Sequence, residues 1–180
     1  MKILSTISFI ILIGLTYLTQ TTLSQKQQKS QKCIEFTRPI YRYKTVMVDC
    51  PMVTTNDKRQ APVTSDNMFT VDFNCLVDDT VLCNKVRNVF ITAGKFITAT
   101  LNLKSIIIVN ATLANLCELY GCNGTGILGS ATPTRLIPYI SSDNKARFYP
   151  QALFKQMNLP EHPEFAPNDI MALFNSDTSY

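Results

Sequence analysis

The stretch from Ile106 to Pro138, IIIVNATLANLCELYGCNGTGILGSATPTRLIP, carries most of the structural information in this chain. Its first residues, 106–109, are β-branched and do not alternate with polar residues, which predicts a strand covered on both faces. Two cysteines then close a short loop at 117–122, and a glycine-rich turn follows. The apolar segment 127–131 predicts the next strand, and the flanking prolines favour an extended, edge-like path at 134–137.

One long helix is predicted just upstream of this stretch. Asp78-Asp79-Thr80 offers a capping residue and negative charge at the positive end of the helix. Gly94 lies within the helix, where it weakens the helix slightly and leaves room for a neighbouring element to approach. A helix followed directly by a buried strand predicts an α+β fold, with one long helix packed on a mixed, twisted sheet. The apolar residues recur at three- and four-residue steps, as one helical face requires: Leu82, Val86, Val89, Phe90, Ala93, Ile97 and Leu101.

Shorter elements are predicted on both sides of this core. Alternating residues indicate one strand at 39–49, ended by Cys50-Pro51, and another at 68–73. Residues 149–157 predict a short helix, and 170–174 predict a last short strand.

The start of the chain has the order of a secretory signal peptide: Lys2, an apolar run to residue 18, and a small-residue exit before residue 25. A membrane anchor is the alternative, although the run is short for a span and no basic flank follows it directly. We expect cleavage of residues 1–24, which leaves a secreted, extracellular protein without a stable membrane span. Residues 25–66 would then form a basic leader with one strand and a loop, and 67–180 the main domain.

The net charge of +4 is too small to indicate nucleic acid binding. Six cysteines follow the signal region, and an even number in a secreted chain predicts disulfides. They allow 15 pairings, of which we prefer the one between nearest neighbours. A zinc site is disfavoured because no cysteine pair has zinc-knuckle spacing and the chain has one histidine. The cysteines are Cys33, Cys50, Cys75, Cys83, Cys117 and Cys122.

Two sequons support the secretory route. Asn110-Ala-Thr and Asn123-Gly-Thr both fit the acceptor pattern for N-glycosylation. Asn123 lies in the glycine-rich loop, where a glycan is easily accommodated. Asn110 lies at the end of a strand, a position that favours glycosylation less than the loop does.

The remaining motifs do not indicate a cofactor-binding, catalytic or calcium site. Gly124-Thr-Gly126-Ile-Leu-Gly129 matches the dinucleotide-binding glycine pattern, but that motif needs a helix to follow, and Pro133 blocks one. His162 lies in a proline-rich loop, where an exposed histidine is expected more often than a catalytic one. Neither serine nor cysteine hydrolase chemistry is supported. The turn acids Asp143, Asp169 and Asp177 match no calcium loop.

Several ordered blocks resemble a secreted, zincin-like metallopeptidase family of fungal type. They are CNKVRNVFITAG from Cys83, LNLKSIIIVNAT from Leu101, ILGSATP from Ile127, FYPQALFKQ from Phe148 and NDIMALFNSD from Asn168. The resemblance covers roughly residues 74–177 and implies the N-terminal subdomain of a zincin fold. In that family, NSD precedes a helix with H-E-x-x-H, whose histidines bind zinc and whose glutamate activates water.

No residue of this sequence matches the H-E-x-x-H motif. The expectation is therefore a truncated, non-catalytic relative with no catalytic residue, metal ligand or cofactor of its own, although the full-length family uses zinc. What the resemblance carries over is a substrate-binding edge strand that pairs with an extended peptide or protein. It assigns that role to Ile127, Leu128, Gly129, Ser130 and Ala131. The alternative is a small, disulfide-rich secreted binding or effector protein, with this strand serving ordinary sheet pairing.

Overall fold

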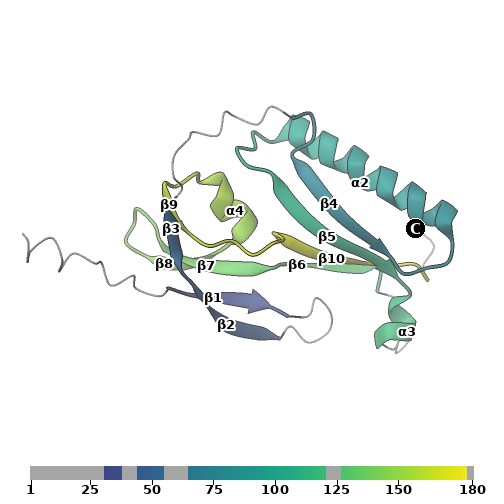
Figure 1. Ribbon diagram of the computed structural model, residues 1–180, viewed down its shortest axis with the longest axis horizontal. Coiled ribbons are helices and arrows are strands. Elements are labelled where there is room, and N and C mark those ends of the chain that lie inside the picture. The colour runs from purple at the N-terminus through teal and green to yellow at the C-terminus, as the bar shows by residue number, and fades with distance from the viewer. Residues whose placement is uncertain (1–30, 38–43, 55–64, 121–126, 178–180) are drawn as a thin grey trace, which may run out of the picture. The chain divides into compact units, whose positions relative to one another are not determined.

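Strands dominate the computed structural model, which describes residues 31–37, 44–54, 65–120 and 127–177. All of them belong to one structural unit, Gln31–Tyr180. Of the described residues, 44% lie in strands and 25% in helices. The described strands form three sheets (Figure 1).

The first sheet has four antiparallel strands in the order β2-β1-β7-β8. Its strands are β1 Gln31–Phe36, β2 Thr45–Cys50, β7 Arg135–Ile140 and β8 Ala146–Pro150. The second sheet has the order β4-β5-β10-β6, in which β4, β5 and β10 are parallel and β6 is antiparallel to β10. Its strands are β4 Phe69–Cys75, β5 Ile107–Ala114, β6 Gly129–Pro133 and β10 Ile170–Asn175. The third sheet pairs β3 Met52–Thr54 with β9 Glu161–Pro163.

The predicted α+β fold class, with one long helix on one mixed sheet, is wrong. The strands outnumber the helices and are divided among three sheets. The sequence predicts one strand before residue 66, but β1, β2 and β3 all lie there. Strand β2 overlaps the end of the predicted strand, whereas β1 and β3 are not predicted because both are short and pair with distant segments: Ile34 of β1 with Leu136 of β7, and Val53 of β3 with His162 of β9.

Helix α2, Thr80–Thr100, packs on β4 of the second sheet (Figure 1). The Asp79 side chain caps it by accepting a hydrogen bond from Leu82 N. Gly94 is buried at the contact, and a Cβ there would lie 2.6 Å from Asn67 Oδ1. This explains the glycine, because a Cβ would displace the Asn67 side chain from its hydrogen bond with Phe69 N and would lie only 3.1 Å from Phe69 Cβ at the start of β4. Three residues of the predicted packed face are exposed instead: Val89 by 64%, Leu101 by 53%, and Ala93.

Two further helices are short: α3, Leu116–Tyr120, and α4, Gln151–Gln156. Helix α4 packs against β7 and β8 and is also tied to the second sheet through Asp169 at the start of β10. The Asp169 carboxylate is fully buried and accepts hydrogen bonds from Gln151 Nε2, Lys155 Nζ and Ile108 N, each at 2.8 Å. The network satisfies the buried charge on every side, which is what allows an ion pair to be buried there.

Two of the predicted disulfides are present. Cys33–Cys50 joins β1 to β2 inside a buried cluster with Ile137 and Phe154. Cys75–Cys83 joins the end of β4 to the first turn of α2. Cys117 is also disulfide-bonded. Cys122, its predicted partner, lies outside the described residues.

In the part of the chain that the structure describes, no helix is both long and apolar enough to cross a membrane.

Candidate functional site

The predicted substrate-binding strand lies at one edge of the second sheet. Strand β6 covers 129–133, two residues later than the predicted 127–131, and it pairs with β10 on one side. The order of that sheet ends at β6, so within the described residues no further strand of the sheet lies beyond it. Figure 1 shows β6 running beside β10, with the chain then continuing into β7.

The pairing with β10 determines which backbone groups of β6 face outward. Thr134 N donates to Asp169 O at one end of the pair, and Asn175 N donates to Leu128 O at the other. Backbone groups alternate along an antiparallel strand, so Leu128, Ser130 and Thr132 face β10. The N–H of Thr134 also points to the β10 side, whereas its C=O accepts from Phe36 N of β1. Gly129 and Ala131 therefore aim their N–H and C=O groups away from the sheet.

Small side chains leave this outer edge accessible. Gly129 and Ala131 are both exposed, and the Phe90 ring of α2 covers the sheet one strand away, over Phe174 of β10. A Cβ on Gly129 would lie 2.6 Å from Leu173 O, so this position needs glycine for the close approach to β10. Neither Gly129 nor Ala131 carries a large side chain of its own beside the outward backbone groups that an extended peptide would pair with.

A buried asparagine, Asn175, holds the start of this edge strand in place. It is fully buried at the end of β10, and its Oδ1 accepts hydrogen bonds from Leu116 N at 3.0 Å and Asp177 N at 3.1 Å. Its Nδ2 donates to Ile127 O at 2.9 Å. Asn175 therefore links β10 to α3 and to Ile127, the residue that leads into β6. Sequence reasoning missed it, although a polar residue closing the apolar run IMALF was the available indication.

The five predicted edge residues have different positions. Ile127 precedes β6 and its carbonyl oxygen is held by Asn175, while Leu128 and Ser130 direct their backbone groups toward β10. Gly129 and Ala131 alone among the five direct theirs outward. The structure thus narrows the candidate peptide-binding groups to these two residues.

The described residues do not fit a zinc site. His162, the one histidine of the chain, stacks on the Phe165 ring with centroids 4.3 Å apart, and its Nδ1 lies 2.8 Å from Pro163 O. Across the described ranges no three His, Cys, Asp or Glu side chains gather as metal ligands.

The shifted carboxyl pKa values belong to other parts of the chain. In the turn between β7 and β8, the Arg147 guanidinium and the Ser141 hydroxyl hold the pKa of Asp143 well below its ordinary value. Before β4, hydrogen bonding to Lys95 lowers the pKa of Asp66. Neither group lies on β6, so β6 offers backbone and shape rather than acid–base chemistry.

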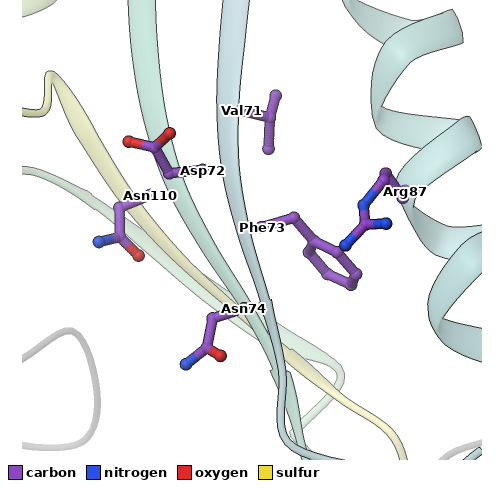
Figure 2. A pocket seen from close by; sticks show the side chains of 6 residues that line it. All are labelled: Val71, Asp72, Phe73, Asn74, Arg87 and Asn110. Atoms are coloured by element: carbon purple, nitrogen blue, oxygen red, sulfur yellow. The ribbon is translucent and has the colours of Figure 1, made fainter. Parts of the chain in front are cut away.

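The opposite edge of the same sheet carries an open hollow of about 510 Å³. Figure 2 shows its lining on both sides of β4: Asp72, Asn74 and Asn110 on one side, and Val71, Phe73 and Arg87 on the other. The Arg87 guanidinium lies over the Phe73 ring, 5.7 Å from its centroid. Asn110, one of the predicted glycosylation sites, is exposed there, whereas Asn123 lies outside the described residues.

Comparison with known proteins gives the chain a family. The model of a family described as SPBPB7E8-like matches residues 18–180. A Schizosaccharomyces pombe protein described as uncharacterized protein PB7E8.01 is 29% identical over 144 residues, a match that covers 73% of this chain and 25% of that protein. The chain thus spans about a quarter of the length of this relative. No solved structure matches the chain.

Proposed function

The chain belongs to the SPBPB7E8-like family, and we propose that it forms the substrate-binding part of a secreted, zincin-like metallopeptidase. In this proposal β6 binds an extended peptide by strand addition, and the described residues bind without hydrolysing. The observation that carries the proposal is the antiparallel edge strand, with Gly129 and Ala131 directing their backbone groups outward.

Strand addition matches the chemistry of this edge. Gly129 and Ala131 each offer one N–H and one C=O, and a peptide strand pairing with both would take up these groups in register. Pro133 has no N–H and ends the donor row. Main-chain bonding gives affinity with little demand on sequence, which suits a site that accepts varied peptides.

The Ala131 amide provides the sharpest test of peptide binding. A peptide selected from a randomised short-peptide library would be titrated into the wild-type domain, Ala131→Pro and Ala131→Ser by calorimetry. Proline removes one outward donor and is tolerated at an edge strand, whereas serine keeps the donor. We expect Ala131→Pro to weaken binding about two- to tenfold and Ala131→Ser to leave it unchanged. Equal affinities for all three proteins would refute strand addition at β6.

The link to metallopeptidases is tested on the longer relative. The full PB7E8.01 protein, of which this chain spans 25%, would be assayed for zinc content and for chelator-sensitive cleavage of a denatured protein substrate. Zinc with chelator-sensitive cleavage would support the proposal. Absence of both, with peptide binding retained, would favour the alternative of a secreted binding protein.

Secretion is supported by the amino-terminal pattern and by the disulfides, which form and persist in oxidising compartments. Amino-terminal sequencing of protein from the culture medium should begin after residue 24. Retention of the chain in the cytosol, with its cysteines reduced, would contradict the secretory route.

A further inference from the structure

We propose that Asn110 carries an N-linked glycan whose first sugars lie in the hollow beside β4. The proposal rests on the secretory route of the proposed function, because N-glycans are added to proteins that enter that route. It does not depend on peptide binding at β6, which is the other edge of the sheet.

The geometry of β5 leaves the acceptor side chain accessible. Side chains alternate along the strand, so Ala111 and Leu113 are buried on the face toward α2, while Asn110 is exposed on the opposite face. Thr112, the third residue of the sequon, shares that face with Asn110. A strand in the middle of a sheet usually hides one face or both, but here the face with the acceptor is open.

The surroundings of Asn110 have the chemistry that sugars need. Asp72 is the register partner of Asn110 on β4, and Asn74 is the partner of Thr112. Figure 2 shows the side chains of Asp72, Asn74 and Asn110 on the same side of β4. Within the described part of the chain, none of these three side chains makes a hydrogen bond. A carboxylate and an amide can bond sugar hydroxyls, and the hollow of about 510 Å³ has room for them.

A glycan at this place would also cover an exposed sheet edge. Ile107 N donates to Met68 O at 2.9 Å and Leu76 N donates to Leu113 O at 2.8 Å, so the even-numbered residues of β4 face β5. Val71 and Phe73 therefore direct their backbone groups outward, along the hollow. Open edges of this kind pair with other chains unless something covers them. The glycan would shield this edge from association.

The test compares two substitutions at one residue, Thr112. Thr112→Val keeps the branched shape and destroys the sequon, whereas Thr112→Ser keeps the sequon. The full chain would be secreted from a eukaryotic host, both with its own first 24 residues and with a strong secretion leader in their place. Enzymatic deglycosylation in ¹⁸O-labelled water, followed by peptide mass spectrometry, would report glycan occupancy at Asn110 and at Asn123 separately. Sedimentation would report association.

We expect Asn110 to be glycosylated in the wild-type chain and in Thr112→Ser, and unmodified in Thr112→Val. In sedimentation, Thr112→Val should also contain species larger than the monomer. Secretion is shown by chains that have lost residues 1–24 or carry a glycan at Asn123. If Asn110 is unmodified in such chains, the proposed glycan at Asn110 is refuted and the secretory route is not. Retention of residues 1–24, with neither sequon used, would overturn both. A glycosylated Asn110 with a fully monomeric Thr112→Val would refute the shielding of β4.

Discussion

Replacing Asp169 by asparagine should destabilise the protein by about 3 kcal/mol, because it removes the charge from a buried network. The two carboxylate oxygens of Asp169 accept hydrogen bonds from Gln151, Lys155 and Ile108. An amide nitrogen can only donate, so in either orientation it would face a donor. Gln151 cannot rotate to compensate, because its Oε1 accepts from Ala166 N and its Nε2 donates to Ala166 O.

The magnitude follows from burial. Removing one partner of a buried ion pair costs about 3–5 kcal/mol, because the other charge is left without compensation. The Lys155 side chain is 16% exposed and that of Asp169 is 1% exposed. The ammonium group can therefore gain some hydration after the change, which places the expected cost at the lower end, about 3 kcal/mol.

Urea denaturation of the wild type and the variant would measure this cost from the shift in midpoint at constant slope. The matched control is Asp49→Asn, the same substitution in the Lys32–Asp49 ion pair, whose side chains are 53% and 62% exposed. We expect the control to change stability by less than about 1 kcal/mol. A cost for Asp169→Asn within about 1 kcal/mol of the control would refute the reasoning, because it would mean that the buried charge contributes no more than a surface pair.

Three further predictions concern the helix, a turn and the edge strand. Gly94→Ala should lower the urea midpoint even though alanine favours helices by about 1 kcal/mol, because its Cβ would break the hydrogen bond from Phe69 N to Asn67 Oδ1 and crowd Phe69 Cβ at 3.1 Å; a higher midpoint would contradict the close packing. The pKa of Asp143 is lowered from 3.8 in the folded protein, so the stabilisation by its turn should be complete above about pH 4 and lost as the pH falls further. An NMR titration of this carboxyl should move back toward 3.8 in Arg147→Leu, and an unmoved midpoint would exclude Arg147 as the cause. Asn175→Ala should accelerate amide exchange in β6 much more than in β8, and equal acceleration would mean that Asn175 stabilises the fold without positioning the edge strand.

The helix could be predicted from the sequence because its periodicity extends over many turns of one segment. Residues 80–100 form α2 as the apolar spacing indicates. Its rotation could not be predicted, because the contact of Gly94 with β4 decides which face is buried, and this leaves Val89 exposed. The strands β3 and β9 could not be predicted either, since each has three residues and depends on a partner about 110 positions away.

The edge strand could be predicted as an element, but its functional groups could not. An apolar segment between a glycine-rich turn and a proline indicates a strand near 127–131. Which of its residues turn their backbone outward depends on the register with β10, some forty residues later in the chain. The role of Asn175 could not be predicted either, because its side-chain partners, Leu116 and Ile127, lie in two separate segments far from it in the sequence.

The order of strands in the second sheet determines when the sheet can form during synthesis. Strand β10 lies between β5 and β6, yet it is the last of these strands to be made. At about 5–20 residues per second, β6 waits several seconds before the strand that holds it emerges. During that interval β5 has one neighbour and β6 has none, so both are open to chaperones, to modifying enzymes and to wrong partners. Completion of the sheet is therefore a late event, and the residues around Asn175 close it.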